Sequence, residues 1–224
     1  MNELITIKEL YNLDETIAKD IFKDCTYPWE VLSKIGDFII KLGESLDENE
    51  YEKRGENVWV HKTAKVFESA YIAGPAIICA DAEVRHCAFI RGKAIVGEGA
   101  VVGNSTELKN VILFNKVQVP HYNYVGDSIL GFKSHMGAGS ITSNVKSDKK
   151  LIVIKGPDGN IETGLKKIGA MLGDNVEVGC GSVLNPGTIV GRNSNIYPLS
   201  SVRGFVKPAS IYKNKGEIVE KQDN

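Results

Sequence analysis

A repeat of six residues runs through most of the chain, and it constrains the fold more than any other feature. β-Branched aliphatic residues occupy every sixth position of a first run: Val60, Val66, Ile72, Ile78, Val84, Ile90, Val96 and Val102. Alanine stands four residues after each of the first seven of them. A period of six matches neither a helix, at about 3.6 residues, nor an ordinary strand, at about 2. The period fits a chain that turns a corner every six residues and points one branched side chain inward from each side.

The repeat continues beyond this run, with one interruption. It passes less strictly through Leu108 and Phe114, slips near Tyr124 and resumes at Leu130 and Met136. A second clean run follows at Leu172, Val178, Leu184, Val190, Ile196 and Val202. Three such sides make a coil of eighteen residues, and successive coils would stack about 4.8 Å apart as parallel strands. We therefore predict a mainly β protein in which residues 58–210 form a single-stranded parallel β-helix. A β-sandwich with chance alternation would not keep one phase over eight hexads.

The two ends of the chain lie outside the repeat. Residues 1–55 carry apolar side chains at helical spacing, as in Val31, Ile35 and Phe38, and we predict short helices there. Because terminal repeats of a solenoid need a cover, we expect this segment to cap the open end. Residues 211–224 are predicted to be a C-terminal tail.

One internal segment also leaves the repeat. The sixfold count is absent between Asn144 and Leu172, where two apolar stretches, 151–154 and 160–163, flank Gly156-Pro157-Asp158-Gly159. Two short strands around such a turn predict a β-hairpin. We therefore expect residues 145–171 to form a loop ejected from one corner of the β-helix.

Composition limits the classes of protein that this chain can belong to. Lys and Arg number 27 against 28 Asp and Glu, so no global basic excess indicates a nucleic-acid partner. No apolar run approaches the roughly 20 residues that cross a bilayer, and the start of the chain is acidic where a signal peptide is basic. These features favour a cytoplasmic protein. The four cysteines have no zinc-type spacing, and we expect them to be reduced.

The eighteen-residue coil brings two cations together. Arg91 and Lys109 are eighteen residues apart, and both follow an inward aliphatic residue, so both should point outward on one face. A guanidinium fork and an ammonium group suit a phosphate. The alternative is a tolerated surface pair that Glu107 neutralises, and the spacing alone does not choose between the two.

Two histidines are candidates for acid–base chemistry. His121 lies in Val119-Pro120-His121-Tyr122, where the sixfold count falters, and His135 precedes the glycine-flanked Ala138. Histidine exchanges a proton near neutral pH, although a single histidine is more often structural. Glycines beside Ala138 would let a ligand approach backbone N–H groups, which can stabilise an oxyanion.

Non-repeat residues carry a resemblance to a known family. Three stretches match it in residue type and spacing: Glu107-Leu108-Lys109-Asn110, Pro120-His121-Tyr122-Asn123-Tyr124-Val125-Gly126-Asp127 and Gly137-Ala138-Gly139-Ser140-Ile141-Thr142-Ser143-Asn144. They resemble the acetyltransferase domain of bifunctional glucosamine-1-phosphate acetyltransferase / N-acetylglucosamine-1-phosphate uridylyltransferase enzymes, over about residues 58–205. Thr163-Gly164-Leu165-Lys166-Lys167-Ile168-Gly169 is similar to related sugar-1-phosphate nucleotidylyltransferases. The resemblance implies the left-handed, hexapeptide-repeat form of the β-helix.

The resemblance also implies roles for individual residues. It places the general base on His121 and the cations that bind the sugar phosphate on Arg91 and Lys109. The other positions that it assigns are Tyr124 and Asn144 for the substrate, and Ala138 and Cys180 for acetyl-CoA. Two residues depart from the family: His135 stands where relatives have a substrate-contacting asparagine, and Cys180 stands where they have serine. The family is trimeric, with sites between subunits, and needs no metal for acetyl transfer.

The resulting hypothesis is an acetyl-CoA-dependent N-acetyltransferase that acts on an amino-sugar phosphate such as glucosamine 1-phosphate, in the metabolism of UDP-N-acetylglucosamine-type nucleotide sugars. Residues 1–55 are too short for the nucleotidylyltransferase domain of the relatives, so we expect that domain to be absent. Three alternatives stay open. The first is a non-catalytic trimerisation or sensing β-helix beside a separate nucleotidylyltransferase, and the second is a hexapeptide acyltransferase with another amine acceptor. The third is a metal enzyme of the γ-carbonic anhydrase type, which needs three converging histidines.

Overall fold

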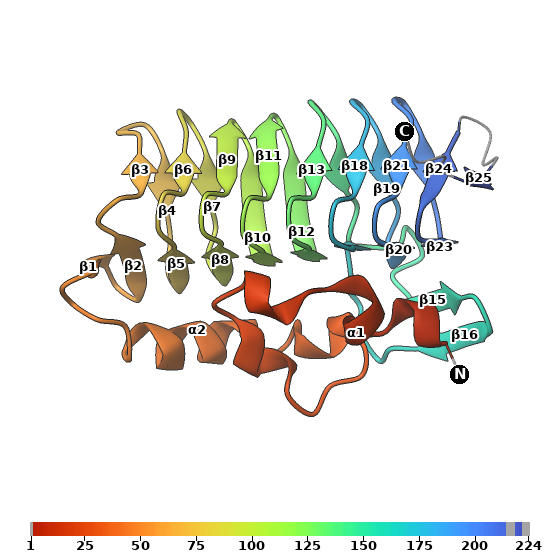
Figure 1. The fold of residues 1–224 in the computed structure, drawn as a ribbon, viewed down its shortest axis with the longest axis horizontal. Coiled ribbons are helices and arrows are strands. Elements are labelled where there is room, and N and C mark those ends of the chain that lie inside the picture. The colour runs from red at the N-terminus through yellow and green to blue at the C-terminus, as the bar shows by residue number, and fades with distance from the viewer. Residues whose placement is uncertain (1, 214–217, 221–224) are drawn as a thin grey trace.

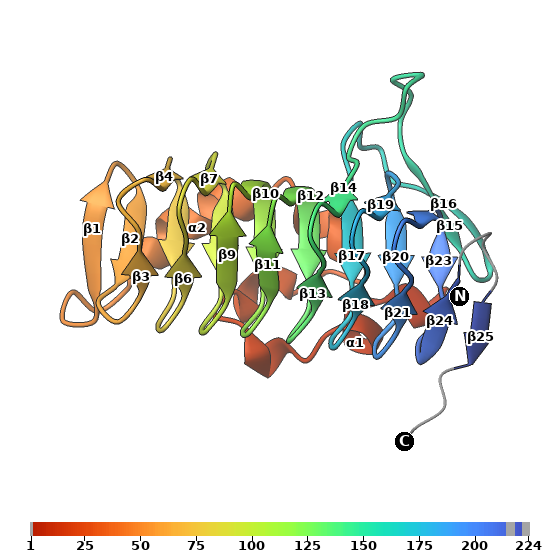
Figure 2. The same ribbon diagram turned by 90° about the horizontal axis from the view of Figure 1, so that it is seen from above.

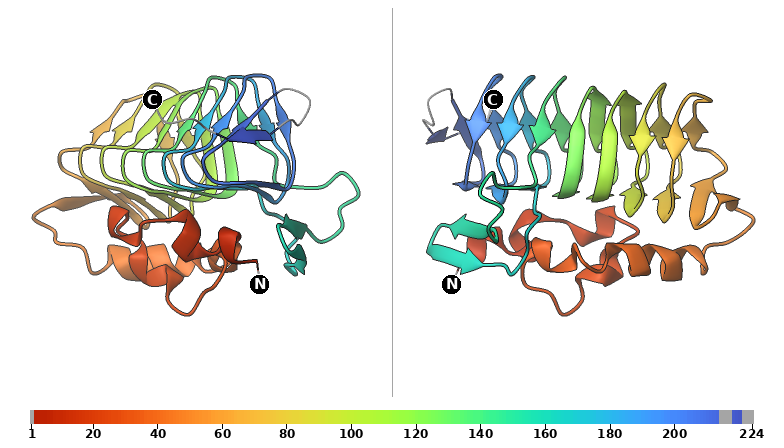
Figure 3. Two further views of the ribbon diagram at one scale, coloured as in Figure 1. Left: turned by 45° about the vertical axis from the view of Figure 1, so that its right-hand side comes forward. Right: turned by 180° about the vertical axis from the view of Figure 1, so that it is seen from behind.

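The fold is a three-sided prism of stacked parallel strands, with helices along one side (Figure 1). It was obtained as a computed structural model that describes residues 2–213 and 218–220. The last positions of the expected tail, 214–217 and 221–224, lie outside the described residues. The main body is the mainly β, left-handed β-helix that the sequence predicts, and Figure 3 shows its three-sided cross-section.

Each side of the prism is a ladder of short parallel strands. Face A contains β2 (Val58–His61), β5 (Ala76–Ile78), β8 (Ala94–Val96), β17 (Ala170–Leu172), β20 (Thr188–Val190) and β23 (Phe205–Val206). Face B contains β3 (Lys65–Val66), β6 (Glu83–Val84), β9 (Val101–Asn104), β11 (Gln118–His121), β13 (His135–Met136), β18 (Glu177–Val178), β21 (Asn195–Ile196) and β24 (Ser210–Tyr212). Face C contains β4 (Tyr71–Ile72), β7 (Phe89–Ile90), β14 (Ile141–Thr142), β19 (Val183–Leu184) and β22 (Ser201–Val202).

Two longer strands join face C to face A. They are β10 (Glu107–Leu113) and β12 (Tyr124–Leu130), which pair with each other along their length. Each bends around the edge between the two faces at one residue with positive φ, Asn110 at 56° and Asp127 at 48°. Asn and Asp tolerate this left-handed backbone better than most residues. The bend therefore places two polar side chains on adjacent coils of the C–A edge.

The inward positions of the sixfold repeat form the core of the prism. Val60, Ile78, Val84, Ile90, Val96 and Val102 are completely buried, whereas Val66 and Ile72 near the N-terminal end are half-buried. Burying an aliphatic side chain of this size contributes about 1.5–3 kcal/mol. The regular apolar column therefore stabilises the stacked coils and fixes which residues face outward.

The register changes earlier than the sequence pattern indicates. Val96 pairs with Leu113 and Val102 with Val119, a spacing of seventeen rather than eighteen residues. The residue that continues the inward column is consequently Leu113. Phe114 is buried instead against the helical segment, where its ring lies 5.1 Å from that of Tyr11. The slip lies at the bend near Asn110, ahead of the position near Tyr124 that the sixfold count suggests.

The N-terminal segment covers a side of the prism. Its helical elements are η1 (Glu3–Ile5), α1 (Ile7–Leu10), η2 (Leu13–Glu15), η3 (Lys19–Phe22), η4 (Pro28–Val31) and α2 (Ile35–Gly43). Helix α2 packs against β5, β8 and β10, and the segment runs along face A (Figures 1 and 3). The expectation that these helices cap the open end is therefore wrong. Of the described part of this segment, β1 (Tyr51–Gly55), antiparallel to β2, lies at that end.

Apolar residues on the outside of face A explain this position. The middle, outward residue of each face A strand is large and apolar, and six of them are fully buried: Ile77, Ile95, Ile112, Ile129, Met171 and Ile189. A ladder with apolar residues on both surfaces needs a second layer. The helical segment supplies that layer.

The predicted hairpin is confirmed. Strands β15 (Val153–Gly156) and β16 (Gly159–Glu162) pair antiparallel around the expected turn, outside the prism (Figure 2). At the other end of the chain, β25 (Ile218–Glu220) pairs antiparallel with β24, so the β-structure extends past residue 210.

Candidate active site

Arg91 and Lys109 lie side by side on face C, next to the C–A edge. Ile90 pairs with Leu108, so the two following residues align on adjacent coils, as the eighteen-residue spacing predicts. Both cations have carboxylate partners. An Arg91 Nη donates to Glu107 Oε1 at 2.7 Å, and this contact raises the pKa of the guanidinium. Glu107 thus neutralises Arg91 in part, and Lys109 has a different partner.

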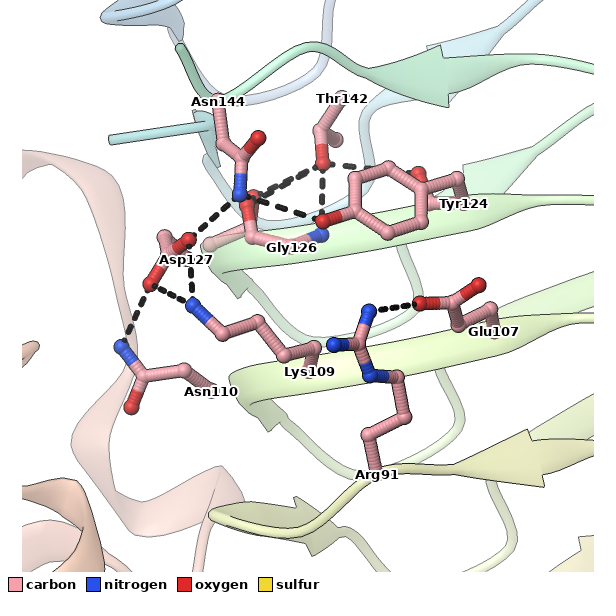
Figure 4. A network of polar contacts seen from close by, with 10 residues as sticks. Arg91, Glu107, Lys109, Asn110, Tyr124, Gly126, Asp127, Thr142 and Asn144 are labelled. Atoms are coloured by element: carbon pink, nitrogen blue, oxygen red, sulfur yellow. Dashed lines mark hydrogen bonds and ion pairs between the residues drawn. The ribbon is translucent and has the colours of Figure 1, made fainter. Parts of the chain in front are cut away.

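Asp127 holds Lys109 in place. The Lys109 ammonium lies 3.0 and 3.1 Å from the two Asp127 carboxylate oxygens (Figure 4). The Asp127 side chain is 5% exposed and also accepts hydrogen bonds from the side-chain amides of Asn110 and Asn144. A buried polar group costs little when its hydrogen bonds are satisfied, and three donors surround this carboxylate. This cluster fixes the position of the ammonium group at the cleft.

Tyr124 completes the network. Its hydroxyl accepts a hydrogen bond of 3.2 Å from the Asn144 side-chain amide, and its ring lies over Gly126. A Cβ atom at Gly126 would come within 2.5 Å of that hydroxyl, so only glycine permits this ring position. Burial, followed by the charges of Asp127 and Glu107, raises the pKa of Tyr124. The phenol is therefore a neutral hydrogen-bonding group at neutral pH.

These side chains border a cleft of about 500 Å³ at the C–A edge. Its lining includes five cations, Arg91, Lys93, Lys109, Lys166 and Lys167, against the single carboxylate of Asp127. Leu32 and Ser33 of the helical segment also line it. The N-terminal segment and the returning arm of the ejected loop thus both contribute to a positively charged cleft.

His121, Ala138 and Cys180 form a second group, on the edge between faces B and C. Each lies one coil from the next: Gly139 N donates to the His121 carbonyl oxygen at 3.0 Å, and Gly181 N to the Ala138 carbonyl oxygen at 2.8 Å. All three residues are exposed. Within residues 2–213 and 218–220, the His121 imidazole forms no hydrogen bond. Face C thus has the cation network at one edge and this histidine at the other.

His135 lies apart from both groups in a single chain. It is on face B, where it pairs with Gln118, and its Nδ1 lies 2.8 Å from Glu177 Oε2. A separate cavity of about 450 Å³ surrounds this pair, beside Lys116 and Lys133. Of the predicted substrate-binding residues, the structure brings together Arg91, Lys109, Tyr124 and Asn144, and it leaves out His135.

Some residues of the cleft were given no role by the sequence analysis. Asp127 is the main one. Lys109 pairs with Gly126 in a seventeen-residue register, so Asp127 lies one position past that partner, at the bend, and the eighteen-residue spacing does not describe this contact. Lys166 and Lys167 were noted only within a motif. Leu32 and Ser33 carried no signal, because nothing in their local sequence indicates that they line this cleft.

Comparison with known proteins identifies the family of the chain. The family model of the GMPPB C-terminal domain matches residues 72–185, which include both edges of face C around the candidate site. The chain belongs to this family. This match, together with the relatives described next, confirms the motif-based resemblance to hexapeptide-repeat acyltransferases.

Several curated relatives match this chain over nearly its whole length. A bifunctional protein GlmU of Methanococcus maripaludis is 32% identical over 98% of this chain and 53% of its own length. A bifunctional sugar-1-phosphate nucleotidylyltransferase/acetyltransferase of Sulfurisphaera tokodaii is 27% identical over 70% of this chain and 43% of its own. The chain spans about half the length of the GlmU relatives that it matches. A solved putative acetyltransferase of Bacillus cereus matches 73% of this chain and 82% of its own at 13% identity, with a TM-score of 0.45.

The described residues contain neither a metal-binding cluster nor a membrane-spanning helix. No group of three or more His, Cys, Asp or Glu side chains there is arranged to hold a metal ion. The four histidines are His61 on face A, His86 and His121 on the B–C edge and His135 on face B. No helix in the described ranges is long and apolar enough to cross a membrane.

Proposed function

We propose that this protein is an acyltransferase that moves an acetyl group from acetyl-CoA to the amine of a phosphorylated amino sugar. The observation that supports this most is the cationic cleft at one edge of face C, with an exposed histidine at the other edge. The cleft offers a fixed ammonium and a guanidinium to a phosphate. The GlmU relatives and the acetyltransferase named in the Sulfurisphaera relative support the same reaction class.

The proposed chemistry uses residues at both edges of face C. Arg91 and Lys109 bind the phosphate, and Tyr124 and Asn144 position the sugar. His121 removes a proton from the amine as its nitrogen attacks the thioester carbonyl, so a C–N bond forms and the C–S bond breaks. The backbone N–H of Ala138 donates to the developing oxyanion, and the departing coenzyme A thiolate takes the proton from His121.

We further propose that the complete site forms between copies of this chain in a homotrimer. In one chain the His121 ring has no orienting partner within the described residues, and His135 lies on a different face from the cleft. Exposed apolar side chains also gather at the B–C edge, with Tyr122 65% and Leu199 80% exposed. A neighbouring prism against this edge would bury them and could bring the His135–Glu177 pair to the substrate.

The test is release of free thiol from acetyl-CoA in the presence of amino-sugar phosphates such as glucosamine 1-phosphate. His121→Ala should lower turnover about a hundredfold or more while KM changes little, the usual scale for loss of a general base. His86→Ala, two coils earlier on the same edge, is the matched control and should keep full turnover. Unchanged turnover in the His121 variant would exclude its role as base.

Arg91→Ala and Lys109→Ala should instead raise KM for phosphorylated acceptors. An equal effect on the corresponding unphosphorylated sugars would count against the phosphate assignment. No thiol release with any amino sugar would favour the alternative of a non-catalytic binding module, for which the ion-paired state of both cations is the supporting observation.

A further inference from the structure

We propose that the A–B edge of the prism holds a second anion-binding site, which takes the phosphate group of a small molecule. The site lies in the cavity of about 450 Å³ that Lys116 and Lys133 line. The inference goes beyond the function proposed above, because none of the residues that line this cavity lines the cleft at the C–A edge. Three features of the two lysines carry it: the lack of a carboxylate partner among the described residues, the aromatic ring that they share, and their backbone conformation.

Lys116 and Lys133 occupy equivalent positions on adjacent coils. The backbone N–H of Lys133 donates to the carbonyl oxygen of Asn115, the residue before Lys116, at 3.1 Å. Gln118 and His135, two residues further along, pair across the same two coils in β11 and β13, which lie side by side in Figure 2. Adjacent coils are about 4.8 Å apart. The fold therefore brings two ammonium groups to one stretch of the edge.

The two ammonium groups lack a counter-ion in the described part of the chain. Within residues 2–213 and 218–220, neither Lys116 nor Lys133 forms an ion pair, whereas the cations that face the proposed substrate do. Glu177, the carboxylate that lines the cavity, contacts His135 at 2.8 Å instead. Like charges on adjacent coils repel each other. A bound anion would remove this repulsion, because it supplies the charge that both lysines lack.

A single aromatic ring holds both ammonium groups. Lys116 Nζ lies 5.8 Å and Lys133 Nζ 5.0 Å from the centre of the Phe132 ring, within the distance of a cation–π contact. The backbone of Phe132 is fixed to the next coil, because its N–H donates to Asp174 Oδ1 at 2.9 Å and its carbonyl oxygen accepts from Asn175 N at 2.8 Å. The cations are therefore arranged around one anchored ring, and binding an anion beside it needs little ordering of the chain.

The backbone at both positions is unfavourable for lysine. The φ angles of Lys116 and Lys133 are 59° and 56°, in the left-handed region that asparagine and glycine tolerate better than other residues. The next two coils have Asn175 and Asn193 at this position of the edge, each with φ of 58°. Lysine on two successive coils thus carries strain that asparagine would avoid. Backbone strain of this kind clusters at functional sites.

A phosphate group suits the pair of lysines. Lysine ammonium groups bind phosphate as point charges, and two of them match the roughly 1.5 to 2 negative charges of a phosphate monoester. Gln118, Asn175 and Glu177 line the rest of the cavity, and their polar groups can bind hydroxyl groups of the molecule that carries the phosphate. A sugar phosphate and the phosphates of coenzyme A are two sources of this group, and the experiment separates them.

Calorimetry on the full chain tests the inference. The chain carries Arg91→Ala and Lys109→Ala, so that phosphate binding in the cleft is weakened. Glucose 6-phosphate, which has no amine to acetylate, and coenzyme A are titrated separately, and at least one should bind saturably. Adding Lys116→Asn and Lys133→Asn should weaken that ligand about tenfold or more, because two charged contacts are lost. The ligand that is weakened identifies the source of the phosphate.

Two further variants separate charge from conformation. Lys149→Asn with Lys150→Asn is the matched control, because it removes two positive charges from the ejected loop, one of them at a φ of 57°. It should change neither affinity. Lys116→Arg with Lys133→Arg keeps both charges and should retain the affinity to within about threefold. Asparagine fits the left-handed backbone, so the asparagine variant at the A–B edge should not lower the urea midpoint of unfolding.

Four results would overturn the inference. The first two are no saturable binding of either ligand and an affinity that is unaltered in the Lys116 and Lys133 asparagine variant. The third is equal weakening in the loop control. The fourth is an asparagine variant that unfolds at a lower urea concentration or changes its oligomeric mass in sedimentation, because the lysines would then serve the fold or contacts between copies of the chain. None of these measurements uses thiol release, so failure of the acyltransferase function would leave the inference standing.

Discussion

Lys109 and Asp127 form an ion pair across adjacent coils, and it links the fold to the candidate site. The ammonium lies 3.0 and 3.1 Å from the two carboxylate oxygens, and Asp127 is also bonded by Asn110 and Asn144. The pair therefore ties the bend at the C–A edge to the outward strands of face C. A change at Asp127 should affect both stability and phosphate binding.

Asp127→Ala should lower the free energy of unfolding by roughly 3 kcal/mol, because it leaves a partly buried ammonium without its counter-ion and two amides without their acceptor. Urea unfolding measures this. Glu52→Ala breaks a comparable pair with Arg54 that is exposed on both sides, and it should cost less than about 1 kcal/mol. Equal losses in the two variants would show that Asp127 is not a structural anion.

The contact between face A and the helical layer can be tested at Ile112. This side chain is completely buried on the outer surface of face A, so Ile112→Ala should cost about 3 kcal/mol. Ile141→Ala, at an outward and half-buried position of face C, should cost only about 1 kcal/mol. Chemical denaturation of both variants is the measurement. A smaller loss at Ile112 than at Ile141 would mean that the helices do not pack on face A in solution.

Thiol labelling tests the coenzyme position without relying on turnover. Burial raises the pKa of Cys79 to about 12, so iodoacetamide should not modify it, whereas the exposed Cys87 and Cys180 should react. Acetyl-CoA should slow modification of Cys180 and leave Cys87 unaffected, as followed by peptide mass spectrometry. Equal protection, or none, at both cysteines would contradict the proposed role of Cys180.

Asp174 gives a pH-dependent prediction. Its carboxylate accepts hydrogen bonds from the backbone N–H groups of Asn12 and Phe132, which ties the N-terminal segment to the prism. Burial is the largest effect on its pKa and raises it, although these hydrogen bonds and Arg192 act in the opposite direction. The folded state therefore binds this proton more tightly than the unfolded state, where the pKa is about 3.9.

The stability that Asp174 contributes is fully present below about pH 4 and is lost as the pH rises through the raised pKa. The advantage of the wild type over Asp174→Asn in urea unfolding should therefore shrink as the pH rises above about 4. Asp20 is an exposed control of opposite sign, because Lys23 lowers its pKa. An advantage over Asp174→Asn that grows with pH would contradict the prediction.

The sixfold repeat determined the prism, because the chain turns a corner every six residues and each side between two corners has one inward position. It also placed Arg91 beside Lys109, since exact stacking needs only a constant coil length between residues 90 and 108. The hairpin followed from its turn residues. These features depend on local sequence, which is why they could be predicted.

Other features depended on contacts between distant parts of the chain. One residue is lost from the coil at Asn110 and another at Asp127, and each loss sets the register to seventeen. The loss at Asn110 moves Phe114 under the helices, and the loss at Asp127 stacks His121 against Ala138. The position of residues 1–55 along face A was decided by the outward apolar ladder from Ile77 to Ile189. The sequence by itself thus determined the spiral and its outward cations. Only the tertiary structure decided that the helical segment covers face A and that Asp127 holds Lys109. It also decided that the helical segment and the ejected loop together form a cleft at the C–A edge. The reason is that burial and ion pairing are properties of neighbours in space, and the repeat specifies neighbours only while its period is kept.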